Sequence, residues 1–267
     1  APVITYALAN TVTHQLTADG ITSFGTYTGS QQLVISLSGP TQVCANSTGN
    51  VYTTDAGKTN YVWVVSNGGT ITGGGTATDN TVTIAWNTAG PQTVSVNYNM
   101  SSNPTVLNVI VNPLPVPTIT GLSSVCAGTT GVNYTTETGM TGYTWTISAG
   151  GTITAGAGTK TITVTWNTAG AQNVSVNYTT SNSCNASTAT VYNVTVNPLP
   201  VPVITGASSV CIGTTGVTYT TETGMTGYSW TISAGGTITA GAGTKTITVT
   251  WQTEGAQSVS VNYTNSN

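Results

Sequence analysis

Hydrophobic and polar side chains alternate along most of this chain with a period of two. In the segments 143–148, 161–166 and 174–178 every second residue is aliphatic or aromatic, and the residues between are Thr, Ser or Asn. This period turns one face of each segment toward a core and the other toward water. Glycine-rich breaks separate the segments, and apolar residues do not recur at helical spacing over three turns. The pattern predicts short antiparallel β-strands.

The chain contains internal repeats. Residues 116–182 align without a gap with residues 201–267, at a spacing of 85, and differ at only 9 of 67 positions. A more diverged copy precedes them and has a cysteine, Cys44, at the matching place. Six or seven short strands within about 85 residues, with turns every 8 to 12 residues, are typical of an immunoglobulin-like sandwich. We therefore expect an all-β chain of tandem antiparallel β-sandwiches.

Proline-rich segments mark the boundaries between the copies. The string Val-Asn-Pro-Leu-Pro-Val-Pro occurs at residues 111–117 and again at 196–202. Alternate prolines favour extended backbone, so these segments are expected to be short, semi-rigid joints rather than ligands for a proline-binding module. The expected modules are, in chain order, a partial module or N-terminal β extension at 1–37, with a hairpin turn at Asp19-Gly20, and repeats at 38–115, 116–200 and 201–267.

Composition excludes several classes of function. Only 3% of the residues are charged, with three lysines, no arginine and a net charge of −3, so the chain cannot neutralise a run of nucleic-acid phosphates. With one histidine, His14, and six scattered acids, a catalytic set could form only by coincidence of the fold. No apolar run is long enough for membrane insertion of this segment. We expect no enzyme, no cofactor and no metal.

The tryptophans could be platforms for carbohydrate stacking or part of the core. Trp145 and Trp166 share the inward phase of the alternation with Ile147 and Val164, which favours core packing. The expected core aromatic residues are Trp63, Trp86, Trp145, Trp166, Trp230 and Trp251.

A family resemblance becomes specific in the repeats. The strings SSVCAGTTGVNYTTETGMTGYTWTISAGG and VNPLPVPTITG resemble the PKD-like, immunoglobulin-like repeats of very large secreted surface proteins of Bacteroidota. The resemblance covers roughly residues 38–267. It implies an extracellular array exported by type IX secretion, in adhesins, gliding-associated fibres or multidomain enzymes. It implies no catalytic or binding residue, because the shared positions are core aromatics, turn glycines and the cysteine.

The four cysteines suggest one disulfide. Cys126 and Cys184 fall within one repeat, at a separation compatible with a bond across the sandwich in an oxidising compartment. Two buried thiols are the alternative. Cys44 has no second cysteine in its own repeat and is expected to be a free thiol. The position that would match Cys184 in the third repeat lies two residues beyond Asn267, so Cys211 is expected to lack a partner.

Two further chemistries concern the charged residues. Lys160 stands in a Gly/Thr turn directly before a strand. A solvated charge that discourages edge pairing is favoured there over a covalent bond to Asn or Asp assisted by Glu137 or Glu222. A calcium site would require the fold to bring Asp55 and Asp79 together.

The third repeat ends before a counterpart of the last strand of the second repeat. Two explanations remain open: continuation of the natural chain, which we favour, or donation of a strand by another chain, for which residues 1–37 are available. The expected function is a non-catalytic structural or adhesive rod in a secreted, cell-surface protein or fibre, with neighbouring repeats and a surface glycan or cell-surface molecule as partners. The alternative is a carbohydrate-binding or spacer module of a secreted multidomain enzyme.

Overall fold

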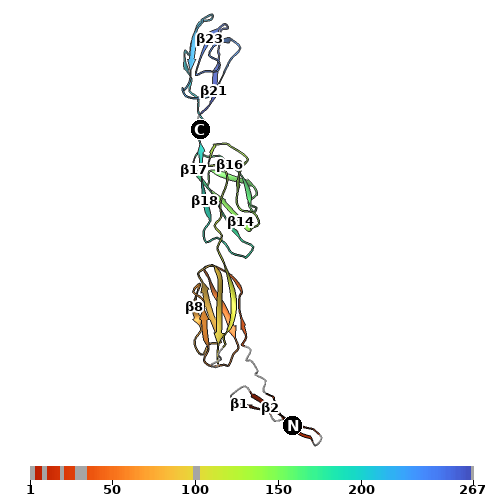
Figure 1. Ribbon diagram of the computed structural model, residues 1–267. Helices are drawn as coiled ribbons and strands as arrows, with labels where there is room; N and C mark the ends of the chain where they lie inside the picture. Colours follow the sequence, from red (N-terminus) through yellow and green to blue (C-terminus); the bar gives the residue numbers. More distant parts are fainter. Residues whose placement is uncertain (1–3, 8–10, 19–20, 28–34, 99–102, 266–267) are drawn as a thin grey trace. The chain divides into compact units, whose positions relative to one another are not determined.

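The computed structural model describes residues 4–7, 11–18, 21–27, 35–98 and 103–265. All regular secondary structure in these ranges is β-strand, in small sheets (Figure 1). The prediction of an all-β chain of tandem immunoglobulin-like sandwiches is confirmed. Contacts divide the chain into two units: Ala1–Pro115 with Thr179–Ser187, and Val116–Tyr178 with Thr188–Asn267.

The N-terminal segment forms a three-stranded antiparallel sheet. Its strands, in the order β1-β2-β3, are β1 (Ile4–Ala7), β2 (Thr11–Ala18) and β3 (Ile21–Tyr27). The expected turn at Asp19-Gly20 lies outside the described residues. Ile35 is only 5% exposed and packs with Leu37 in the core of the first repeat. The core of the first repeat therefore includes residues ahead of position 38, the boundary expected from the sequence.

The first repeat is a sandwich of two four-stranded sheets. One sheet has the order β4-β6-β9-β8 and the other the order β5-β11-β10-β7. Most pairs are antiparallel, but β5 runs parallel to β11 and pairs Cys44 with Asn112. The strands are β4 (Leu37–Ser38), β5 (Gln42–Cys44), β6 (Ser47–Thr54), β7 (Val62–Val65), β8 (Gly69–Gly74), β9 (Thr81–Trp86), β10 (Gly90–Asn97) and β11 (Thr105–Asn112).

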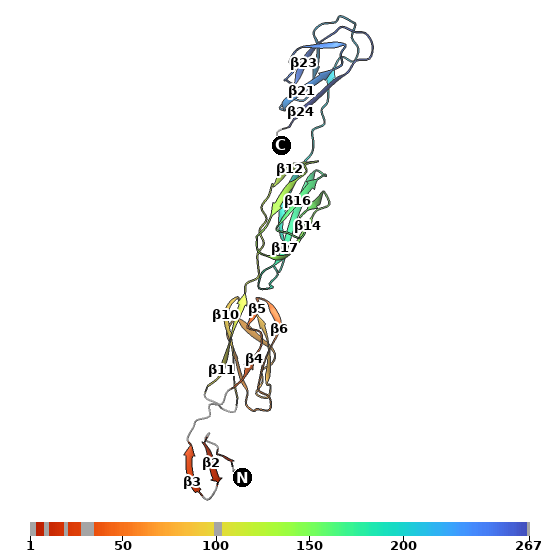
Figure 2. The same cartoon turned by 90° about the vertical axis from the view of Figure 1, so that its right-hand side faces the viewer.

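The second repeat keeps this plan. Its sheets have the orders β13-β16-β15 and β12-β18-β17-β14, and β12 runs parallel to β18, with Cys126 opposite Asn197. Figure 2 shows β12, β14, β16 and β17 of this sandwich from the side. The strands are β12 (Ser124–Cys126), β13 (Val132–Thr135), β14 (Thr141–Ile147), β15 (Gly151–Ala155), β16 (Thr161–Trp166), β17 (Gly170–Thr179) and β18 (Thr190–Asn197).

The third repeat has one complete sheet and one small sheet. The complete sheet has the order β19-β20-β23-β22, and the other contains only β21 and β24. Within the described residues, no strand pairs with the second edge of β24. The strands are β19 (Thr205–Gly206), β20 (Val217–Thr220), β21 (Thr226–Ile232), β22 (Gly236–Ala240), β23 (Thr246–Trp251) and β24 (Val259–Thr264).

Each core is built around a buried tryptophan and tyrosine. In the second repeat, Trp166 and Tyr134 are both 0% exposed and their rings meet edge to face. The Trp166 indole N–H donates to the Tyr134 hydroxyl (3.1 Å), which donates to the Leu122 carbonyl (3.0 Å). The chain of bonds satisfies polar groups whose burial would otherwise be costly. Equivalent bonds join Trp86 to Tyr52 and Trp251 to Tyr219.

The tryptophan also explains a glycine that recurs in each repeat. A Cβ atom placed on Gly151 would lie 2.6 Å from Cε3 of Trp166, closer than carbon atoms can approach without rearrangement. Only glycine lets the start of β15 pass this close to the indole. Gly151 and Trp166 are paired on neighbouring strands of one sheet, so the indole lies against the backbone of β15.

Candidate functional site

Few reactive groups come together in the described part of the chain. No group of three or more His, Cys, Asp or Glu side chains there is close enough to hold a metal ion. In the same ranges no helix could cross a membrane. Among the groups that form defined arrangements in these ranges are one disulfide and, in each repeat, one carboxylate that binds a backbone N–H.

The disulfide joins Cys44 to Cys184, with their Cα atoms 5.6 Å apart. The expected pairing of Cys126 with Cys184 is therefore wrong, and so is the expectation that Cys44 is a free thiol. The bond connects the first repeat to a loop that lies, in sequence, between two strands of the second repeat. Contacts place that loop, Thr179–Ser187, in the same unit as the first repeat.

The geometry of β18 explains why Cys126 does not reach Cys184. Cys126 lies opposite Asn197, the last residue of β18, whereas Cys184 precedes Thr190, the first residue of that strand. Eight residues of strand at a rise of about 3.3 Å separate these ends by roughly 23 Å. A disulfide requires Cα atoms within about 7 Å. Cys126 therefore lies beside the end of β18 that is farther along the chain from Cys184.

We call residues Thr179–Ser187 the cysteine loop. The Thr180 N–H donates to the Cys184 carbonyl (2.9 Å), and the Cys184 N–H donates to Thr180 Oγ1 (3.2 Å). Ser183 adopts a φ of 62°, in the left-handed region, which closes the turn just before the cysteine. Cys184 is 1% exposed. The loop thus holds its cysteine in a fixed position.

The surface that receives this loop, the loop acceptor, consists of Cys44 and Asn112. Besides the disulfide, the side-chain amide of Asn182 donates to Asn112 Oδ1 (3.0 Å). Asn112 is held in turn, because its amide nitrogen donates to the Val43 carbonyl (3.2 Å) and its carbonyl accepts from the Ala45 N–H (2.8 Å). Asn112 is buried although it is polar, and these bonds satisfy it.

Each repeat also has a carboxylate that binds the backbone entering the repeat, which we call the acid latch. In the first repeat, Asp55 accepts from the Ser36 N–H (3.1 Å), from Ser36 Oγ (2.7 Å) and from the Tyr98 hydroxyl. Hydrogen bonds from Tyr98 and Ser36 lower the pKa of Asp55 to about 2. Burial, together with the bond to Asp55, raises the pKa of Tyr98 to about 12.

The second and third repeats have the same latch with glutamates. Glu137 accepts from the Thr118 N–H (3.0 Å), and Glu222 accepts from the Val203 N–H (2.9 Å). Burial alone would raise the pKa of Glu137, but bonds from Thr118 and the neighbouring Thr136 prevail and lower it to about 2. Hydrogen bonds, the largest from the neighbouring threonine, lower the pKa of Glu222 to about 2 as well. All three latches hold a charged carboxylate at neutral pH.

Hydrogen bonds define the surroundings of Asp55 and Asp79, the two acids considered for a calcium site. Asp55 belongs to the latch, whereas Asp79 accepts from the N–H and hydroxyl of Thr76 in a turn. The sequence interpretation missed the latch. The available signal was its spacing, because the three latch acids recur along the chain at the same two intervals as Cys44, Cys126 and Cys211.

The structure places all six tryptophans in the cores. None is more than 8% exposed. The indole N–H of Trp145, on β14, donates to the Thr159 carbonyl (2.8 Å). The tryptophan faces are therefore covered by protein, and they offer no open stacking platform for a sugar ring.

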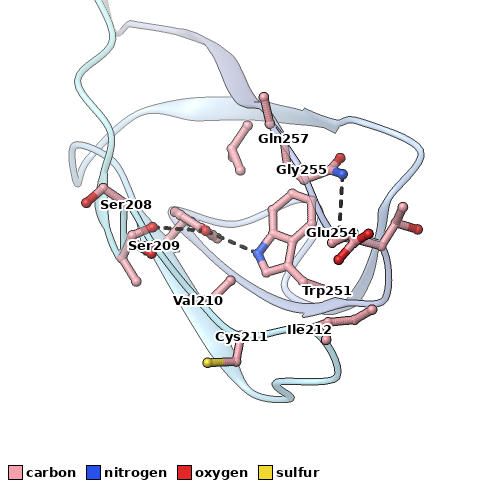
Figure 3. Close-up of a pocket in the computed structure, with 14 residues that line it drawn as sticks. Ser208, Ser209, Val210, Cys211, Ile212, Trp251, Glu254, Gly255 and Gln257 are labelled. Carbon is pink, nitrogen blue, oxygen red and sulfur yellow. Dashed lines mark hydrogen bonds between the residues drawn. The ribbon is translucent and has the colours of Figure 1, made fainter.

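A hollow of about 730 Å³ lies beside Trp251 in the third repeat (Figure 3). Segments 207–212 and 253–257 line most of it. The matching surface of the second repeat is covered by β18, which is why Val125 is 7% exposed there and its counterpart Val210 is 37% exposed. The hollow thus lies on the surface that corresponds to the one covered by β18 in the second repeat.

The fold and its repeated, mutually similar cores define a chain of tandem immunoglobulin-like sandwiches. The chain belongs to the family of PKD-like domains, whose family model matches residues 30–109, 112–194 and 197–267. The family and fold are those of non-catalytic repeat domains. The resemblance inferred from the repeat strings is confirmed at the level of this family.

Comparison with other proteins gives distant structural likenesses. No curated protein matches the chain. The D00-D0 domain of intimin is 18% identical, with a TM-score of 0.32, and the match covers 60% of this chain and 99% of that one. Domains 4 and 5 of the S-layer protein SbsC are 15% identical, with a TM-score of 0.28, covering 61% and 98%. The fibronectin(III)-like modules of Clostridium thermocellum CbhA are 13% identical, with a TM-score of 0.30, covering 62% and 95%.

Proposed function

We propose that this chain is a non-catalytic structural or adhesive segment of a long extracellular protein, in which repeated sandwiches set reach from a cell surface or build a fibre. Two near-identical copies in series support this role. Length increases with every added copy, whereas a single active site gains little from duplication. The proposed partners are neighbouring repeats and a surface glycan or other cell-surface molecule.

The observation that carries the proposal is the Cys44–Cys184 disulfide. It links the first repeat to a loop of the second across the Pro-rich joint, and such a link is useful to a protein under tension. Disulfides of this kind form in oxidising compartments, which supports a secreted location. Together with the family resemblance, this leads us to propose export to the cell surface, by the type IX route of Bacteroidota.

The described side chains support a role without catalysis. The three latch carboxylates are bound by the protein's own hydroxyl and N–H groups, as Glu137 is by Thr118. A general acid or base needs a pKa near the working pH, whereas the latch carboxylates have their pKa lowered to about 2. They are suited to holding backbone rather than to transferring protons.

A binding and hydrolysis screen of the folded 267-residue chain tests the proposal. The chain is applied to degradable storage and cell-wall polysaccharides and, in parallel, to glycans of cell surfaces, with the reduced and heat-unfolded chain as control. We expect neither hydrolysis nor saturable binding to the degradable polysaccharides. Saturable binding to one of them, with a Kd below about 1 mM, would support the accessory module of an enzyme instead. Binding to cell-surface glycans alone would support an adhesive role.

A further inference from the structure

The second repeat has the same residues as the loop acceptor of the first. Cys126 occupies the position of Cys44, and Asn197 occupies that of Asn112. In both repeats the short strand with the cysteine runs parallel to the last strand and pairs the cysteine with the asparagine. The acceptor is therefore duplicated as a structure and not only as a sequence.

The hydrogen bonds that hold the acceptor asparagine are also duplicated. The Ala127 N–H donates to the Asn197 carbonyl at 2.8 Å, the same distance as from Ala45 to Asn112. The amide nitrogen of Asn197 donates to Ser124 Oγ (2.9 Å), on the short strand that matches the one whose Val43 carbonyl holds Asn112. Both asparagines are therefore held by their amide nitrogen, and Oδ1 is the atom that accepts from the loop in the first repeat.

The two acceptors differ in what covers them. Asn112 is 8% exposed under the cysteine loop, whereas Asn197 is partly exposed. This difference is expected if the second acceptor is built to receive a loop of its own.

The spacing along the chain identifies the partner. Asn182, which bonds to Asn112, follows it by 70 residues, and Asn267 follows Asn197 by the same 70 residues. The joints between acceptor and partner have the same sequence, at 111–117 and 196–202. A cysteine loop on the third repeat would thus meet the second acceptor through the same connection.

We propose that Cys126 and Asn197 form a second loop acceptor, which binds the cysteine loop of the PKD-like repeat on its carboxyl-terminal side and forms a disulfide with it. The partner is a loop of the pattern Ser-Asn-Ser-Cys-Asn, as in residues 181–185. The two thiols lose two protons and two electrons to a disulfide oxidant, which is reduced to two thiols. This second acceptor is independent of the proposed structural or adhesive role, because it rests on the geometry of the first acceptor.

The test completes the third repeat with sequence from the second. Residues 183–200 are appended after Asn267, so that the loop cysteine and last strand follow in register, and the extended chain is refolded with oxidised and reduced glutathione. Chymotryptic peptides are then mapped by mass spectrometry without reduction. Formation of Cys44–Cys184 in the same molecule reports that the first acceptor has folded. A matched extension with serine in place of the appended cysteine is the control.

We expect the appended cysteine to bond to Cys126. Replacing the acceptor amide, Asn197→Ala, should lower the equilibrium fraction of this bond about two- to tenfold, the effect of one hydrogen bond. A bond from the appended cysteine to Cys211, or an appended cysteine that stays reduced while Cys44–Cys184 forms, would overturn the proposal.

A second measurement covers the case in which the extended chain fails to fold. A peptide with the sequence of residues 179–200 is incubated with the 267-residue chain in the same glutathione buffer. The peptide should attach to Cys126 at least about tenfold more than to the exposed Cys211, and a scrambled peptide should show no such preference. Equal attachment at both cysteines would contradict the proposal.

Discussion

Reduction of the Cys44–Cys184 disulfide should lengthen the fully unfolded, stretched chain by about 500 Å. The two cysteines are 140 residues apart in sequence, so the bond closes a ring that contains most of the first repeat and much of the second. When the chain is pulled from its two ends, tension passes through the bond and bypasses the ring. The residues of the ring cannot contribute to extension until the bond is broken.

The magnitude follows from backbone geometry. A stretched residue spans at most about 3.6 Å, so 140 residues contribute about 500 Å. The pairing expected from the sequence, Cys126 with Cys184, would close a smaller ring of about 58 residues, and its reduction would add only about 210 Å of contour length. For a chain without any disulfide, the reductant would add no contour length. These three values are far enough apart to be distinguished.

The assay is single-molecule force spectroscopy with handles at residues 1 and 267. Contour length at complete unfolding is measured in oxidising buffer and again with a dithiol reductant. Cys44→Ser should give the long contour in both buffers, whereas Cys126→Ser and Cys211→Ser should keep the difference of about 500 Å. Contours that agree in both buffers, or that differ by about 210 Å, would refute the reasoning from the observed pairing.

Three smaller perturbations test the sandwich itself. Tyr134→Phe removes the acceptor of the buried Trp166 indole N–H and should lower the free energy of unfolding by about 1–3 kcal/mol in urea denaturation. Gly151→Ala should cost about 1–3 kcal/mol because its Cβ would collide with Trp166, whereas Gly158→Ala, with nothing within 4 Å, should stay within about 0.5 kcal/mol. The pKa of Glu137 is lower in the folded chain, about 2, than in the unfolded chain, about 4.5, so the charged carboxylate stabilises the fold at pH values above about 4.5. This stabilisation is lost as the pH falls toward 2. The difference in melting temperature between wild type and Glu137→Gln should therefore be largest at neutral pH and vanish near pH 2.

The sandwiches could be predicted from the sequence because their signal is local. Alternation within 161–166 assigned the inward face of that strand, and the structure gives this strand a pattern of alternate buried and half-buried residues. The predicted joints rest on an equally local signal, since alternate prolines restrict the backbone wherever they occur. Such features depend only on neighbours in sequence.

The disulfide could not be predicted by pairing cysteines within one repeat. That reasoning assumed that a repeat is covalently self-contained, and it left the direction of the last strand out of account. Cys126 lies beside the last residue of β18, whereas Cys184 precedes the first residue of that strand and is bonded to Cys44. The acid latch was missed for a related reason: Glu137 and Thr118 are distant in sequence, and single acidic residues give no pattern within one repeat.

The cysteine loop of the second repeat bonds to Cys44 of the preceding repeat rather than to Cys126 of its own repeat, and Cys126 belongs to the proposed second acceptor. Duplication of one period therefore creates a matched acceptor and loop without any new interface having to evolve. The first repeat has Cys44 but no cysteine at the place of Cys184, so within this sequence it supplies an acceptor and no loop cysteine. The pairing of Cys44 with Cys184 follows from the direction in which these two repeats are linked.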